Sequence, residues 1–132
     1  MPVNNINFKN RTILITGGTK GIGIGITKSF LKLDANVIVL ARNKPSRNIQ
    51  SKGNAAFFVE CDIRDLDSIA KALKIIQTRY KKLDVLINNA GGAPLADSIS
   101  ASPKFHQAII DLNLMAPLNL SQKVAKVMMR QK

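Results

Sequence analysis

Apolar runs alternate along the chain with stretches in which apolar residues recur every three or four positions. Four of these runs are short and continuously apolar, which predicts buried β-strands. They are Thr12 to Thr16, Asn36 to Ala41, Ala55 to Val59 and Leu83 to Asn88. Continuous apolar strands are typical of a parallel sheet that is covered on both faces.

The first helix is predicted from Ile22 to Leu33, directly after a glycine-rich turn. Apolar residues stand at both of these positions and at Ile26 and Phe30, so their spacings of four, four and three mark one helical face. We expect this face to pack against the sheet.

Two further helices are predicted downstream. Leu66 to Tyr80 carries an apolar stripe, and Asp65 or Asp67 is placed to cap its first turn. Pro103 suits the first turn of a last helix that runs to about Arg130, and Pro117 predicts a kink or break inside it. The polar segments 43–53 and 91–102 are predicted to be loops, the first with room for one helical turn.

This order of elements predicts an α/β fold in a single domain over residues 1–132. Right-handed crossovers favour a doubly wound, Rossmann-like parallel sheet, with strands in the order 3-2-1-4 and helices on both faces. The sheet is expected to be incomplete, because such a dinucleotide fold has two further strands beyond the fourth. The fourth strand would then be an exposed apolar edge.

The composition narrows the class of protein. The chain is 45% hydrophobic and 21% charged, as in ordinary globular proteins. No apolar run approaches the roughly 18 residues of a membrane helix, and residues 1–10 lack a signal-peptide core. The single Cys61 cannot form an internal disulfide. We therefore predict a cytoplasmic protein without a membrane partner.

The net charge of +12 suggests a nucleic-acid partner at first, because a basic field attracts polyanions. The basic residues are scattered, however, and the densest cluster is only Arg79, Lys81 and Lys82. Aromatic residues make up 5% of the chain, too few for a base-stacking platform. We interpret the charge as a generally basic surface and predict no nucleic-acid partner.

The strongest chemical signal is the segment from Thr16 to Gly23, which reads Thr-Gly-Gly-Thr-Lys-Gly-Ile-Gly. It follows a predicted strand and opens a predicted helix, which is the context of a phosphate-binding turn. Glycines let the backbone approach a pyrophosphate, and the helix N-terminus offers free N–H groups. The alternative is a glycine-rich turn without a ligand.

Placed in this way, Thr-Gly-x-x-x-Gly-Ile-Gly resembles the phosphate-loop signature of the short-chain dehydrogenase/reductase family. Three further features match that family in order: Asp62 after the third strand, Asn88 to Gly91 (Asn-Asn-Ala-Gly) after the fourth, and Asn113 in the last helix. The resemblance extends over nearly the whole chain. It implies an NAD(P)-dependent oxidoreductase that transfers hydride between a nicotinamide and a carbonyl or alcohol substrate.

The resemblance also implies a set of cofactor contacts. Asp62 with Ile63 would contact the adenine ring, and Asn89 to Gly91 would line the nicotinamide-side ribose. Asp62 could instead cap the following helix, and the asparagines could be simple turn formers. The predicted cofactor-binding residues are Gly17, Thr19, Lys20, Gly21, Ile22, Gly23, Arg42, Asp62, Ile63, Asn89, Ala90 and Gly91. No metal site is predicted.

The end of the second strand bears on the choice of cofactor. An acid there would bond the ribose hydroxyls of NAD, but the strand ends Leu40-Ala41-Arg42. The Arg42 guanidinium suits a phosphate, and Lys20 adds a second positive charge. We predict a preference for NADP over NAD; the alternative is that both are ordinary solvated members of the twenty basic residues.

The family's catalytic residues are matched only by Asn113. Hydride transfer in the family uses a serine and a Tyr-x-x-x-Lys pair, whereas the only tyrosine, Tyr80, is followed four residues later by Asp84. Tyr80 and His106 are interpreted as packing or surface residues.

We expect the chain to be catalytically incomplete. The alternatives are half of a split reductase completed by another chain, or a non-catalytic NADP(H)-binding module. A carbonyl or alcohol substrate applies only to a completed enzyme, and a homo-oligomer is possible.

Overall fold

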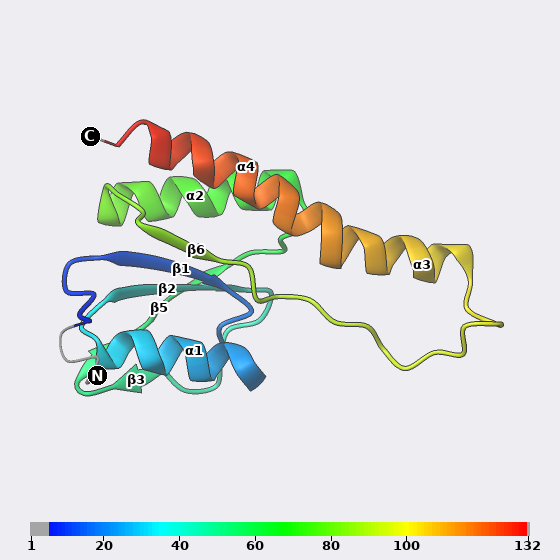
Figure 1. Ribbon diagram of the computed structural model, residues 1–132, viewed down its shortest axis with the longest axis horizontal. Coiled ribbons are helices and arrows are strands. Elements are labelled where there is room, and N and C mark those ends of the chain that lie inside the picture. The colour runs from blue at the N-terminus through cyan, green and yellow to red at the C-terminus, as the bar shows by residue number, and fades with distance from the viewer. Residues whose placement is uncertain (1–5, 132) are drawn as a thin grey trace.

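The computed structural model describes residues 6–131, and its centre is a four-stranded sheet between helices (Figure 1). The strands are β1 (Thr12–Thr16), β2 (Asn36–Ala41), β5 (Phe57–Glu60) and β6 (Val85–Ile87). They run parallel in the order β5-β2-β1-β6. These are the third, second, first and fourth predicted strands, so the doubly wound sheet and its order are confirmed.

The middle of the sheet is β1, which pairs with β2 on one side and β6 on the other. All five of its residues are buried. Its register aligns Ile13 with Val37 of β2 and with Val85 of β6. A strand with both edges paired and both faces covered has to be apolar throughout, which is why Thr-Ile-Leu-Ile-Thr reads as a continuous run.

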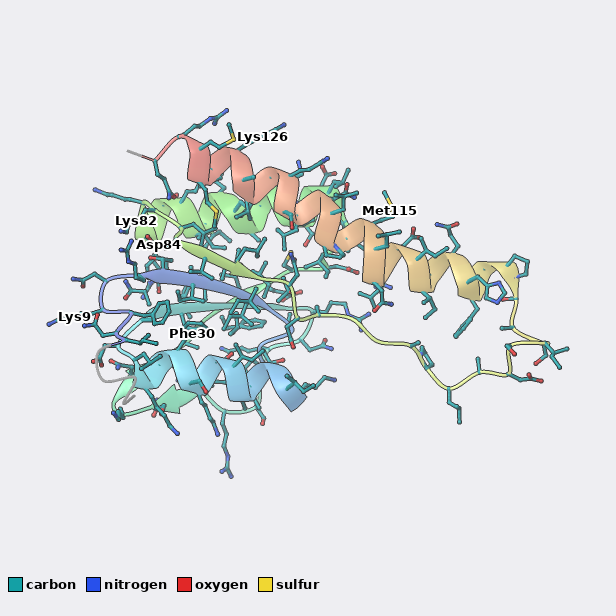
Figure 2. The ribbon with its side chains drawn as sticks, in the orientation of Figure 1. Lys9, Phe30, Lys82, Asp84, Met115 and Lys126 are labelled. Atoms are coloured by element: carbon teal, nitrogen blue, oxygen red, sulfur yellow. The ribbon has the colours of Figure 1, made fainter. Side chains whose placement is uncertain are left out.

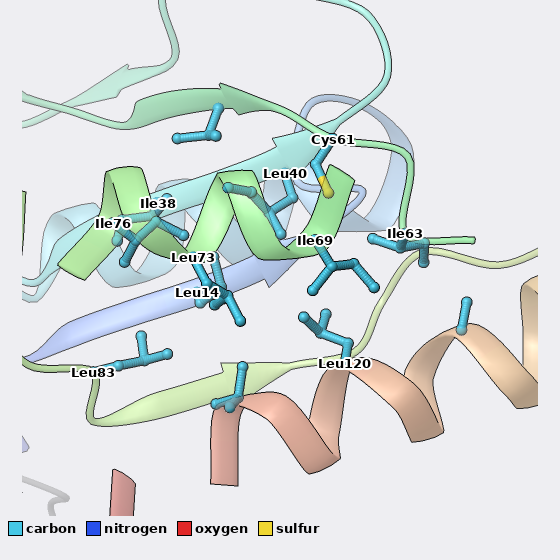
Figure 3. Close-up of a cluster of buried hydrophobic side chains, with 14 residues drawn as sticks. Leu14, Ile38, Leu40, Cys61, Ile63, Ile69, Leu73, Ile76, Leu83 and Leu120 are labelled. Carbon is cyan, nitrogen blue, oxygen red and sulfur yellow. The ribbon is translucent and has the colours of Figure 1, made fainter. Parts of the chain in front are cut away.

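Helices cover both faces of the sheet, as predicted (Figure 1). The helix α1 (Gly21–Lys32) lies on one face, and α2 (Leu66–Tyr80) and α4 (Ala116–Met129) lie on the other. Figure 3 shows the core beneath α2 and α4, where Ile69 and Leu73 meet Leu14 of β1. The predicted stripe of α2 is therefore confirmed, and Asp65 caps this helix by accepting a hydrogen bond from the Asp67 amide at 2.9 Å.

The predicted apolar face of α1 is confirmed only in part: Ile26 and Phe30 are half-buried and pack against the core, whereas Ile22 is 80% exposed. The fully buried residues of this helix are Gly23, Thr27 and Leu31. This face of α1 needs small side chains because the helix lies close to the turn after β1. The Thr27 hydroxyl donates a hydrogen bond to the Gly18 carbonyl of that turn at 2.9 Å. A large apolar side chain at position 23 or 27 would hold the helix away from the turn.

The segment from 43 to 53 contains no helical turn, contrary to the prediction. Instead, β3 (Gln50–Ser51) and β4 (Asn54–Ala55) form a short antiparallel hairpin. Lys52 and Gly53 connect them with φ angles of 50° and 79°. Two successive residues in the left-handed region are the geometry of a tight hairpin turn, and glycine makes the second of them inexpensive.

The last helical region is interrupted just before Pro117. It consists of α3 (Pro103–Ile110), a π-helical turn, η1 (Asp111–Met115), and α4. Proline has no N–H and crowds the carbonyl four residues earlier, so the wider π turn accommodates it. The predicted break is confirmed, one turn earlier than Pro117 itself. Figure 1 shows that α3 extends beyond the sheet, and it buries none of its residues.

Asp84 closes the sheet at the amino ends of β1 and β6 (Figure 2). Its carboxylate accepts a hydrogen bond from the Thr12 amide at 2.8 Å and pairs with Arg11 at 3.0 Å and Lys82 at 3.3 Å. Burial raises the pKa of Asp84, but the Thr12 hydrogen bond and the two cations outweigh it, so this pKa lies below its ordinary value.

We predict that Asp84→Asn destabilises the fold. Because the pKa of Asp84 is lowered by folding, the carboxylate stabilises the folded state above its ordinary pKa of about 3.9, and this contribution is lost as pH falls through the folded pKa. The variant should lower the free energy of unfolding by roughly 1–2 kcal/mol at pH 7, since it removes a charged acceptor. Urea unfolding followed by circular dichroism measures this difference.

Repeated at successively lower pH, the same titration should show the difference between the variant and the unaltered chain shrinking below the ordinary pKa of Asp84, because protonation removes the charged acceptor. Glu60→Gln is the matched control, since Glu60 is an exposed acid for which the described residues show no ion pair. Equal loss of stability in both variants at pH 7 would contradict the role given to Asp84.

Candidate functional site

A cavity of about 560 Å³ opens at the carboxyl ends of the parallel strands. Its walls come from the turn after β1 and from the loops after β2, β5 and β6. The lining residues are Gly17, Thr19, Lys20, Ile22, Gly23, Leu40, Ala41, Arg42, Asn43, Lys44, Pro45, Ser46, Cys61, Asp62, Ile63, Arg64, Asn89, Ala90, Gly91 and Leu112. The strand order reverses between β1 and β6, and the crevice at such a switch point is the general ligand site of open α/β sheets.

The cavity brings together nearly all of the residues that the sequence analysis named as cofactor contacts. They converge from four separate segments of the chain on one space. Gly21 is the exception among them: its φ of 56° shapes the turn, but it does not line the cavity. Asn113 also lies outside the lining.

The first turn of α1 is open toward the cavity. Its N-cap residue is Lys20, which makes no side-chain cap, and no acid stands in the first turn. By contrast, α2 is capped by Asp65, and α3 is capped by Ser102, which accepts from the Phe105 amide at 3.1 Å. The N–H groups and the partial positive charge at the start of α1 therefore remain available to an anion.

Thr16 and Asn89 join the glycine turn to the loop after β6. The Thr16 hydroxyl accepts hydrogen bonds from the backbone amides of Asn89 at 3.0 Å and Ala90 at 2.9 Å. The Asn89 side-chain amide donates to the carbonyls of Thr16 at 3.0 Å and Gly17 at 3.2 Å. Asn89 is thus more than a turn former, because its side chain ties the two loops into one wall. The neighbouring Asn88 points elsewhere and donates to the Ser121 hydroxyl at 3.0 Å.

Asp62 stands on the cavity wall after β5 and does not cap α2, whose cap is Asp65. Its carboxylate binds Arg64 through the guanidinium, at 3.0 Å from Nε and 2.8 Å from Nη2, and through the Arg64 backbone amide at 3.0 Å. These bonds to Arg64 outweigh partial burial and hold the pKa of Asp62 below its usual value, with a smaller contribution from Arg42.

Positive charge gathers at the end of the cavity formed by the loop after β2. Arg42 and Lys20 come from different loops, as predicted, and line the same space. Lys44 and Ser46 of that loop and Arg64 after β5 also line the cavity and were not predicted. The available signal was positional, because loops that follow neighbouring parallel strands meet at one edge of the sheet.

Asn113 lies in the π turn and holds the loop after β6. Its side chain accepts from the Gly92 amide at 2.8 Å and donates to the carbonyls of Gly92 and Ile109, both at 2.9 Å. A Cβ at Gly91 would meet the Asn113 side-chain oxygen at 2.8 Å, so this contact also favours glycine there. Within residues 6–131, Asn113 therefore holds the loop after β6 in place and does not line the cavity.

Tyr80, His106 and Cys61 carry the other side chains considered for catalysis, and of these only Cys61 lines the cavity. Tyr80 ends α2 and packs edge-on against Phe57, with ring centroids 6.0 Å apart. His106 is exposed on α3. Burial raises the pKa of the Cys61 thiol. Within residues 6–131, no group of acids, histidines and cysteines is arranged to hold a metal, and no helix has the length and apolarity to cross a membrane.

Comparison with known proteins identifies relatives across almost the whole chain. The family described as short chain dehydrogenase matches residues 11–132. Oxidoreductase UcpA of Escherichia coli (strain K12) is 32% identical over 126 residues, which covers 92% of this chain and 48% of that protein. The chain thus spans about half the length of this curated relative.

Solved structures agree with the sequence comparison. The ligand-free aldohexose dehydrogenase of Thermoplasma acidophilum superposes with a TM-score of 0.84 at 26% identity, over 95% of this chain and 47% of that one. A short chain dehydrogenase from Leptospira borgpetersenii with bound NAD⁺ has a TM-score of 0.83 at 26% identity, over 96% of this chain and 50% of that one.

The close approach of α1 to the glycine turn predicts opposite effects at two glycines of the same helix. A Cβ at Gly23 would stand 2.0 Å from the Gly17 carbonyl oxygen and 2.6 Å from the Asn89 side-chain nitrogen. We expect Gly23→Ala to lower the free energy of unfolding by roughly 1–3 kcal/mol, the usual cost of overpacking. Thermal or urea unfolding measures it.

The control is Gly25→Ala, because a Cβ at Gly25 meets nothing within 4 Å. That change should raise stability by about 0.5–1 kcal/mol, since alanine favours the helix interior over glycine. If both substitutions shift the unfolding midpoint in the same direction, the close approach does not constrain position 23.

Proposed function

This chain belongs to the short chain dehydrogenase family, and from that membership we propose that it is the NADP(H)-binding portion of an oxidoreductase. Nicotinamide dinucleotides are the typical cofactors of this family. We propose that residues 1–132 form one dinucleotide-binding unit. A bound nicotinamide would donate or accept the hydride, and the reaction of the whole protein would interconvert a carbonyl and an alcohol.

The observation that carries the proposal is the cavity at the switch point of the sheet. Its residues fit a dinucleotide in chemistry as well as in position. The uncapped start of α1 and the glycine turn offer backbone N–H donors for a pyrophosphate. A pyrophosphate held there would direct one nucleoside toward the loop after β5 and the other toward the loop after β6.

The two nucleosides would meet different groups. On the adenine side, Asp62 would accept a hydrogen bond from the exocyclic amino group, with Ile63 beside it. On the nicotinamide side, the backbone of Asn89 to Gly91 would line the ribose, because the Asn89 side chain is already engaged with the glycine turn. The cavity is about 560 Å³ and partly open, which suits an extended ligand.

The preference for NADP rests on charge. Strand β2 ends at Ala41 and Arg42 follows it, so no carboxylate is placed to hold both ribose hydroxyls of NAD. Arg42 and Lys20 line the cavity together with Lys44 and Ser46, and this set of cations and a hydroxyl suits a 2′-phosphate. The relative with bound NAD⁺ shows only that this fold in that protein takes the dinucleotide without the phosphate.

We predict that the chain binds NADPH about tenfold more tightly than NADH at moderate salt, because one charge-assisted phosphate contact at a partly solvated site is worth roughly 1.5 kcal/mol. Arg42→Ala should remove most of this difference and leave the Kd for NADH within about twofold. Nucleotide fluorescence titration measures both constants. The matched control is Arg47→Ala, since Arg47 is exposed in the same loop but does not line the cavity. Tighter binding of NADH than NADPH would overturn the preference.

A second prediction concerns turnover. Hydride transfer to a carbonyl needs a group that donates a proton to the developing alkoxide. The 132 residues hold one tyrosine, Tyr80, which packs against Phe57 at the end of α2 and does not line the cavity. We therefore expect the purified chain to bind NADPH without consuming it in the presence of aldehydes and ketones, as followed by absorbance at the nicotinamide band.

Sustained NADPH consumption by the chain alone would disprove its catalytic incompleteness. Turnover that appears only with a second chain would favour the split-reductase alternative, whereas binding without turnover under every pairing would favour a non-catalytic NADP(H)-binding module.

A further inference from the structure

Arg64 and Asp62 form a two-point ion pair on the wall of the cavity. The guanidinium donates from Nε to Asp62 Oδ1 at 3.0 Å and from Nη2 to Oδ2 at 2.8 Å, and the Arg64 backbone amide donates to Oδ1 at 3.0 Å. Both residues line the cavity. Their side chains are 39% and 35% exposed, so the pair faces the space that a ligand would fill rather than the core.

This pairing leaves the Asp62 carboxylate with one free lone-pair site that can accept a hydrogen bond from a ligand. A carboxylate has about four lone-pair sites, two on each oxygen. Two N–H groups of Arg64 occupy Oδ1, and one occupies Oδ2. The remaining site is on Oδ2, and its direction is set by the planar fork of the guanidinium. A lysine could offset the charge of Asp62 but could not fix both oxygens in this way.

The pair also changes the charge of the wall. A free carboxylate would repel an anionic dinucleotide, whereas a carboxylate paired with a guanidinium presents no net charge. Arg42 and Lys20 can then act on the ligand phosphates without an uncompensated acid in the same cavity. Arg64 therefore affects both the orientation of an acceptor and the electrostatics of the site.

We propose that Arg64 is a positioning residue for adenine recognition: it orients the Asp62 carboxylate and compensates its charge, so that Asp62 can accept a hydrogen bond from an adenine amino group in the presence of the ligand's phosphates. This proposal deepens the proposed function and rests on it. Arg64 orients the acceptor through Asp62, so its effect on adenine binding must disappear when Asp62 can no longer serve as a charged acceptor.

The chain contains a matched control for this pair. Arg11 and Asp84 form an arginine–aspartate ion pair at 3.0 Å at the opposite, amino-terminal end of the strands, outside the cavity. Arg11→Ala and Arg64→Ala each remove an exposed guanidinium from an aspartate. Loss of binding that follows only the second change cannot come from the loss of an ion pair in general.

The experiment measures the Kd of NADPH for the unaltered chain and for three single variants. We expect Arg64→Ala to weaken binding about tenfold, Arg64→Lys to weaken it about threefold, and Arg11→Ala to leave it within twofold. Adenosine, which has no phosphate, separates orientation from charge: Arg64→Lys should weaken adenosine as much as Arg64→Ala does, because lysine restores only the charge. Thermal unfolding of each variant confirms that it is folded at the titration temperature.

A double-mutant cycle with Asp62→Asn provides the decisive outcome. In that background Arg64→Ala should change the adenosine Kd by less than twofold, because adenosine has no phosphate on which the charge of Arg64 could act. If Arg64→Ala weakens adenosine binding as much in the Asp62→Asn background as with Asp62 intact, Arg64 contacts the ligand directly and the positioning role is overturned. Equal or tighter NADPH binding by Arg64→Ala alone would overturn the inference while leaving the proposed function intact. Absence of NADPH and NADH binding by the unaltered chain would remove both.

Discussion

The hydroxyl of Thr16 joins the two strands between which the sheet reverses its order. It is 1% exposed and accepts two backbone hydrogen bonds from the loop after β6, while the Asn89 side chain returns two hydrogen bonds to the turn after β1. Unpaired amides at a buried position cost about 1–3 kcal/mol each, so this junction strongly favours one arrangement of the two loops. The glycine turn and the loop after β6 therefore behave as a single wall of the cavity.

The two ends of the sheet are built for different purposes. At the amino end of the strands, the Asp84 carboxylate accepts a hydrogen bond from the first amide of β1 and forms ion pairs with Arg11 and Lys82. These charges neutralise one another. At the carboxyl end, the start of α1 has no cap, and Arg42 and Lys20 line an open space. Stability is gained where the ion pairs are satisfied, and the capacity to bind an anion lies where the donors are left open.

Much of the fold could be predicted because it depends on local patterns. The apolar runs placed the strands, and the right-handed crossover rule ordered them. The apolar face of α1 was predicted only in part, because residue size rather than hydrophobicity decides which residues of this helix meet the turn at Gly23. The hairpin at Lys52 and Gly53 was missed because its strands are only two residues long and carry no alternation.

The sequence by itself determined the family, the order of the sheet and the segments that meet at its carboxyl edge, because these follow from repeating patterns and short motifs. Only the tertiary structure decided which side chains within those segments engage one another. The Arg64 guanidinium donates to the Asp62 carboxylate, and the Asn113 side chain accepts from the Gly92 amide. The Asn88 side chain donates to the Ser121 hydroxyl instead of facing the cavity. Such contacts depend on side-chain directions and on distances of a few ångströms between loops, and spacing along the chain carries no information about either.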